Sequence, residues 1–215
     1  MTHTLHRDGD AASFGDDYIL LAIPAKGHND EGAVEKLRTF LRICAAHKPV
    51  NMGNGDLGAY HPSQGSPTPD YEKVIASVSK PNSVAAEFDS KEKLVAALRE
   101  VIKADLGISI NLSNAVEAAH QCCRETGIKR HSVEYSLGFM DRHNHLPNSQ
   151  VLELSTMCGH GMVSHNLVEK MIAYVKENER TPEEAAAYLA CFCPCGVYNP
   201  ARAKRLLEEA RTRQH

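Results

Sequence analysis

Short apolar runs alternate with longer segments of helical periodicity over the first two thirds of the chain. An apolar run of about four to eight residues is typical of a strand, whereas apolar residues spaced three and four apart are typical of a helix. The expected strands cover 17–23, 83–88, 107–112 and 131–139, and the expected helices cover 31–47, 70–79, 89–104 and 113–127. This alternation predicts an α/β fold with a mixed or mostly parallel sheet and flanking helices.

The pattern changes near residue 149, after which the chain becomes largely helical. A last strand is expected over 150–156, followed by helices over 166–178, 182–190 and 200–213. The short connection between the first two of these helices predicts an antiparallel pair. We therefore expect a disordered arm over 1–16, an α/β domain over 17–148, and a strand plus a helical metal-binding unit over 149–215.

Residues 48–70 are rich in Gly, Pro, Asn and Ser, so no regular element is expected there. A loop of this length inside a domain is uncommon, and such loops are often lids or binding loops.

Four of the seven cysteines lie in two short C-terminal segments. Metal binding or thiol chemistry explains an odd, bunched set of cysteines better than a disulfide framework does. The first segment is Cys158-Gly159-His160-Gly161, and the second is Cys191-Phe192-Cys193-Pro194-Cys195-Gly196. Alternate residues of an extended chain point the same way. We expect the helical pair to bring both segments, and the four sulfurs, to one end of the unit.

The cysteine spacing favours an iron–sulfur cluster, with zinc as the alternative. Thiolates bind both, but the C-x-x-C pairs usual at zinc sites are absent. Cys191 falls where the preceding helix should still be turning, so its side chain is expected to point away. Cys158, Cys193 and Cys195 would then hold a 4Fe–4S cluster with one iron open to substrate. If all four cysteines bind, the centre is closed.

Candidate catalytic and substrate-binding residues lie in three loops. His160 lies in the glycine-containing cysteine loop and is a candidate for proton transfer or for metal ligation. Lys26, His28 and Asn29 follow the first strand, in the region where α/β sheets gather their ligands. His143 belongs to a polar loop before the last expected strand. We assign His160 and His28 as catalytic candidates, and Lys26, Asn29 and His143 as substrate-binding candidates.

An open iron acts as a Lewis acid, so the leading hypothesis is an iron–sulfur enzyme of lyase or desulfidase type. A closed centre would suit an electron-transfer or cluster-carrying protein. A zinc-stabilised interaction module and metal-free thiol chemistry at Cys158 are further alternatives. The helix expected after Cys158 predicts a lowered pKa for its thiol.

The formal net charge of −3 disfavours a broad basic face, so no nucleic-acid partner is expected. No apolar run approaches the roughly 18 residues that a bilayer-spanning helix needs, so no membrane partner is expected. We expect a cytoplasmic protein that acts on a small molecule and could form a homo-oligomer.

Overall fold

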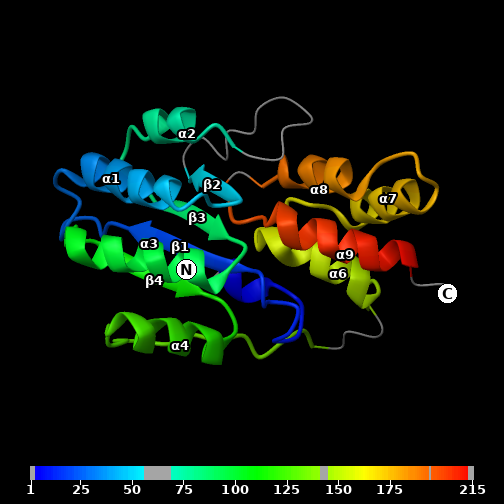
Figure 1. Cartoon of the computed structure of the whole chain (residues 1–215), viewed down its shortest axis with the longest axis horizontal. Coiled ribbons are helices and arrows are strands. Elements are labelled where there is room, and N and C mark those ends of the chain that lie inside the picture. Colours follow the sequence, from blue (N-terminus) through cyan, green and yellow to red (C-terminus); the bar gives the residue numbers. More distant parts are fainter. Residues whose placement is uncertain (1–2, 56–68, 141–144, 194, 213–215) are drawn as a thin grey trace.

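The computed structural model describes residues 3–55, 69–140, 145–193 and 195–212. These residues form one sheet with helices beside it, followed by a C-terminal helical unit (Figure 1). The strands are β1 (Tyr18–Ile23), β2 (Asn51–Asn54), β3 (Val84–Phe88) and β4 (Ser109–Ser113). The helices beside the sheet are α1 (Ala33–Ala46), α2 (Tyr71–Ser77), α3 (Lys91–Ala104) and α4 (Val116–Thr126). The C-terminal unit contains α6 (Ser149–Ser155), the 3₁₀ helix η2 (Thr156–Cys158), α7 (His165–Lys176), α8 (Pro182–Ala190) and α9 (Pro200–Thr212).

Every pair of neighbouring strands is antiparallel, so the prediction of a mixed or mostly parallel sheet is wrong. The strand order is β2-β3-β1-β4. The α1 and α3 crossovers each join two strands that run in the same direction, as the alternating pattern implies. However, the strands joined by one crossover are not neighbours: β3 lies between β1 and β2, and β1 lies between β3 and β4. The result is the split β-α-β-β-α-β arrangement of ferredoxin-like sheets, which the order of strands and helices alone does not distinguish from a parallel sheet.

Successive residues of β1 face two different helical layers. Leu20 and Ala22 pack with α1 and α3, whereas Ile19 and Leu21 pack with the C-terminal helices. Because side chains alternate between the two faces of a sheet, a strand covered on both faces needs apolar residues at every position. The continuous apolar run of β1 is explained by this double burial.

The C-terminal helices begin at side-chain caps that the sequence carries. Thr181 and Glu184 form a reciprocal capping box at the start of α8, and Pro182 takes the first helical position. Ser164 caps α7, so this helix begins one residue before the predicted range. The three helices predicted here are confirmed, with small shifts at their ends. None of the helices within the described ranges is long and apolar enough to cross a membrane.

Two predicted strands are not found among the described residues. Residues 150–156 are helical, because Asn148 caps α6 and the apolar side chains share one helical face. Residues 131–139 have no regular structure, and Tyr135 and Leu137 are exposed. An alternating segment forms a stable strand only beside another strand, and β4 pairs with β1 alone in this part of the chain.

Two segments are more ordered than expected. Residues 51–54, inside the segment predicted to be irregular, form the edge strand β2 and pair with β3. The expectation of a disordered arm does not hold for residues 3–16, which include the 3₁₀ helix η1 (His3–His6) and pack on the C-terminal unit. The Asp8 amide donates to Thr156 Oγ1 at 2.8 Å. Both segments depend on partners distant in the sequence, so local composition does not reveal their order.

Candidate functional site

The helical pair α7 and α8 brings two loops together at one end of the C-terminal unit. Cys158 ends η2, before the loop that leads into α7, and Cys193 follows α8 closely. The connection between the two helices is short and the helices pack against each other. The chain after α8 therefore returns to the level of Cys158, as an antiparallel pair requires.

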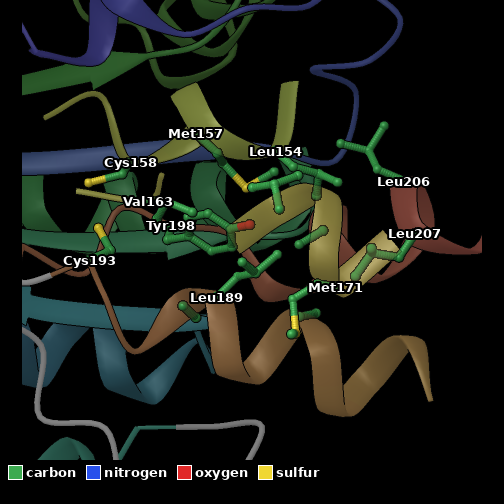
Figure 2. Packing of buried hydrophobic residues seen from close by; sticks show 14 of the residues in the cluster. Leu154, Met157, Cys158, Val163, Met171, Leu189, Cys193, Tyr198, Leu206 and Leu207 are labelled. Atoms are coloured by element: carbon green, nitrogen blue, oxygen red, sulfur yellow. The ribbon is translucent and has the colours of Figure 1, made fainter. Parts of the chain in front are cut away.

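Three cysteine sulfurs meet there: Cys158, Cys193 and Cys195, hereafter the cysteine centre. Cys193 lies in the middle, with its Sγ 3.7 Å from Cys195 Sγ and its thiol hydrogen-bonded to that of Cys158. Cys158 and Cys193 are fully buried, whereas Cys195 is partly exposed. Figure 2 shows the sulfurs of Cys158 and Cys193 at the margin of the apolar cluster, away from the packed leucines.

His160 approaches the cysteine centre from the solvent side. Its Nδ1 lies 3.6 Å from Cys195 Sγ, and its side chain is exposed. Gly159 and Gly161 have φ values of 74° and 70°, a left-handed conformation that glycine adopts at little cost. These two turns allow the chain to place both a buried cysteine and an exposed histidine at the same site.

Cys191 points away from the cysteine centre. It is the C-terminal cap of α8, it is exposed, and its thiol donates to the Ala187 carbonyl at 3.2 Å. This bond runs back along the helix, so the sulfur is directed toward the preceding turn. Three cysteines converge, and the fourth stays on the helix end.

The loop that carries Cys193 and Cys195 packs directly against strand β2. A Cβ built on Gly53 would lie 2.3 Å from the Cys195 carbonyl carbon, and a Cβ on Gly196 would lie 2.3 Å from Gly53 N. Asn51 Nδ2 also donates to the Tyr198 carbonyl at 2.7 Å. The position of the loop is therefore set by close contact between two backbones and by a buried amide.

The three thiols differ in acidity because each has different neighbours. The hydrogen bond with Cys193, together with burial, raises the pKa of Cys158 well above its ordinary value. The bond with Cys158 lowers the pKa of Cys193, but its bond with Cys195 and burial outweigh this and raise the pKa to about 12. The bond with Cys193 lowers the pKa of Cys195. The predicted lowering at Cys158 is wrong, because burial and a neighbouring sulfur outweigh the helix that follows.

Backbone amides face all three sulfurs. Five of them lower the pKa of a thiol: those of His160 and Met162 act on Cys158, that of Tyr198 acts on Cys193, and those of Val197 and Cys195 itself act on Cys195. Hydrogen bonds to cysteine sulfur tune the charge and potential of metal–thiolate centres. The backbone around the cysteine centre thus stabilises negative charge on sulfur.

The loop after β1 lies apart from the cysteine centre. Lys26 and His28 are exposed in it, and the Asn29 side chain bonds to the Ala25 amide and to the backbone just before β4. These bonds close the loop without involving a cysteine. Figure 1 shows this blue loop at the end of the sheet remote from the C-terminal helices. His143 lies outside the described residues.

The described cysteine, histidine and acidic side chains contain no group of three or more arranged to hold a single metal ion. In the cysteine centre, the sulfurs form a chain in which Cys193 contacts both of its neighbours. A closed zinc site requires four ligands around one point; the three sulfurs and His160 Nδ1 are the candidates among the described residues, and they do not surround a common point in this structure.

The sequence did not predict the residues that fix the position of the cysteine loop against the sheet. Gly53 and Asn51 lie in a segment for which no regular element was expected. A glycine inside a strand often marks the close approach of another backbone, so M-G-N-G could have suggested the contact once the strand was known.

No protein-family model, no curated protein and no solved structure matches this chain. Its function is therefore inferred from the site itself.

Proposed function

We propose that this chain binds an iron–sulfur cluster through Cys158, Cys193 and Cys195, and that one iron of the cluster acts on a small polar substrate. The observation that carries the proposal is the meeting of Cys158 with the Cys193–Cys195 loop across a helical pair. Thiolates select zinc or iron–sulfur clusters among the common metal centres. Three convergent cysteines with amide support are a suitable ligand set for such a group.

The ligand number favours an open centre. Cys191 is bonded to its own helix, so three sulfurs rather than four are available. A closed zinc site would need His160 as the fourth ligand, and a common point for all four groups. A cluster does not need a common point, because each cysteine binds a different iron atom. The 3.7 Å contact between the sulfurs of Cys193 and Cys195 is the spacing of two thiolates on one tetrahedral ion, so cluster binding would require these sulfurs to move apart until each reaches its own iron.

The exposed side of the cysteine centre is where a substrate would bind. When present, an open iron would polarise a substrate oxygen or sulfur. Cys195 is the most exposed of the three cysteine residues, and His160 lies against it on the solvent side. His160 is placed to hold or deliver a proton there. We therefore propose a lyase or desulfidase type of reaction, without a role for Lys26, His28 or Asn29.

A reducing compartment suits this site. Closely spaced thiols persist where glutathione and thioredoxin keep them reduced, and no disulfide joins the described cysteines. The proposed location is accordingly the cytoplasm.

Metal-free thiol chemistry at Cys195 is a second candidate function. It is favoured by the 3.7 Å contact with Cys193 and by the lowered pKa of Cys195. A thiolate beside a second thiol is suited to disulfide exchange. The two candidates differ in whether the active protein contains a metal.

Anaerobic purification followed by iron, sulfide and zinc analysis, with a visible absorption spectrum, tests the proposal. Iron and sulfide in comparable amounts, with a broad visible band, are expected. Redox cycling without turnover of any substrate would favour an electron-transfer or cluster-carrying protein. Stoichiometric zinc in a colourless sample would favour an interaction module, and metal-free active protein would favour thiol chemistry.

Single cysteine variants test the ligand set. Cys158→Ser, Cys193→Ser and Cys195→Ser should each lose most of the iron. Cys191→Ser is the matched control, since it lies in the same segment but outside the cysteine centre, and it should retain the cluster. Equal iron loss in all four variants would mean that four cysteines bind.

A further inference from the structure

Two carboxyl groups are buried side by side between the sheet and the C-terminal unit. Asp17 immediately precedes β1 and Glu87 lies on β3, and both are fully buried. Glu87 is the sheet partner of Ile19. The side chains of Asp17 and Glu87 are therefore diagonal neighbours on one face of the sheet, below the start of α9.

Each carboxyl group has one engaged oxygen and one unpaired oxygen. Asp17 Oδ2 accepts from Arg7 and, at 2.7 Å, from Arg202. Glu87 Oε1 accepts from Asn199 Nδ2 at 3.1 Å. Asp17 Oδ1 and Glu87 Oε2 are buried and find no hydrogen-bond partner among the described residues. Two carboxylate oxygens cannot satisfy each other, whereas a carboxylate and a carboxylic acid can.

The surrounding charges favour one proton on the pair. The guanidinium groups of Arg7 and Arg202 are matched by Asp17 and by Glu153, which lies 3.3 Å from Arg202. An ionised Glu87 would add a third anion to a buried site with two cations. Two adjacent buried carboxyl groups do not both ionise readily, because like charges repel strongly where water is excluded.

We propose that Glu87 is held as a neutral carboxylic acid that donates a hydrogen bond to Asp17, accepts one from Asn199, and thereby positions the cysteine loop. Asn199 ends the segment that starts at Cys195, and its Oδ1 accepts from the Arg202 amide at the start of α9. Glu87 is thus a positioning residue, which acts on the cysteine centre through Asn199 and the backbone between them.

The acid–base properties of the two groups agree with this assignment. Burial and the charge of Asp17 raise the pKa of Glu87 well above its ordinary value, although Arg7 and Arg202 act to lower it. Burial also acts to raise the pKa of Asp17, but Arg7 and Arg202 outweigh it and lower the pKa to about 2. The shared proton therefore resides on Glu87.

Infrared spectroscopy tests the proton directly, because a protonated carboxyl group absorbs apart from carboxylates. The wild-type protein at neutral pH should show a protonated-carboxyl band. Glu87→Gln should remove this band, whereas Glu117→Gln, on an exposed residue paired with Arg124, should leave it. Absence of the band from the wild type, or its survival in Glu87→Gln, would overturn the assignment.

Thiol labelling of metal-free protein tests the positioning role. Glutamine can donate through its amide nitrogen and accept through its oxygen. Glu87→Gln should therefore keep the labelling rate of Cys195 within about twofold, whereas Glu87→Ala should raise it about tenfold, the scale of one lost buried hydrogen-bond partner. Labelling of Cys191 in the same samples is the internal reference and should not change. Equal Cys195 rates in both variants would contradict the role.

The pH dependence of stability gives a second test that does not need the alanine variant to fold. Between the unfolded and folded pKa values of Glu87, the native state holds a proton that the unfolded state has released. Stability therefore falls as the pH rises through this window. Glu87→Gln should lack this decline, and a profile parallel to that of the wild type would refute the proposal.

None of these measurements requires a bound metal. A chain without a cluster would still be expected to show the protonated carboxyl group. Conversely, failure of the Glu87 assignment would leave the metal analysis of the cysteine variants unaffected.

Discussion

Gly53 of β2 and Gly196 of the cysteine loop lie backbone against backbone, with no room for a side chain on either residue. The contact joins the edge of the sheet to the loop that carries two of the three convergent cysteines. Replacing Gly53 by Ala would place a methyl group against the Cys195 backbone, which cannot rotate away. We expect the free energy of unfolding to fall by about 1–3 kcal/mol, as for other overpacked sites.

Urea unfolding of Gly53→Ala measures this loss, with Gly55→Ala as the matched control. A Cβ on Gly55 would meet the Ser83 hydroxyl at 2.9 Å, the end of a side chain that can turn, and the Ser83 carbonyl at 3.2 Å, a milder backbone contact than the one at Gly53. The control should therefore be less destabilised. A similar loss of unfolding free energy in both variants would mean that the contact between Gly53 and the cysteine loop tolerates an added methyl group.

The cysteines of metal-free protein should react with iodoacetamide at different rates. Cys195 should be labelled first at neutral pH, because it is partly exposed and its pKa is lowered by Cys193. Cys191 is exposed, but burial of part of its thiol raises its pKa, so it should follow. Cys158 and Cys193 should react more slowly than either, since both are buried. Fragmentation mass spectrometry over time gives the order, and early labelling of Cys158 would contradict it.

Two arginines one turn apart on α9 should differ in their effect on stability. Arg202 is fully buried and bonds to Asp17 Oδ2 at 2.7 Å, whereas Arg205 is partly exposed and pairs with Asp16. Arg202→Ala leaves a buried carboxylate short of its partner and should cost about 3–5 kcal/mol. Arg205→Ala should cost about 0–1 kcal/mol, since exposed ion pairs contribute little. Chemical denaturation compares them, and equal costs would show that the buried network adds nothing.

Acid should weaken the protein through Asp17. Burial raises the pKa of this group, but Arg7 and Arg202 outweigh it and bring the pKa to about 2. A lowered carboxyl pKa contributes stability above the unfolded value of about 4, and this contribution is lost as the pH falls toward 2. Asp17→Asn should be less stable at neutral pH, and its deficit should shrink over this range. Unfolding curves from pH 6 downward, at about one-unit steps, check this, and a constant deficit would count against it.

The local elements were the most predictable part of the fold. Thr181, Glu184 and Pro182 place the start of α8 through contacts within a few residues, and the predicted helix is confirmed there. Residues 150–156 were wrongly predicted to form a strand, because a short apolar run is compatible with either a strand or a helix. The convergence of Cys158 with Cys193 was also predictable, because a short connection between two helices leaves antiparallel packing as the expected outcome.

By itself, the sequence determined where most helices and three of the strands form, and that two cysteine segments end at the same level. These features depend on caps, periodicity and short connections, which act between near neighbours. The tertiary structure alone decided the order of the strands, the packing of the cysteine loop on Gly53, and the burial of Arg7 beside Asp17. Each of these depends on groups far apart in the chain, whose interaction free energy exists only after the sheet and the C-terminal helices have packed together.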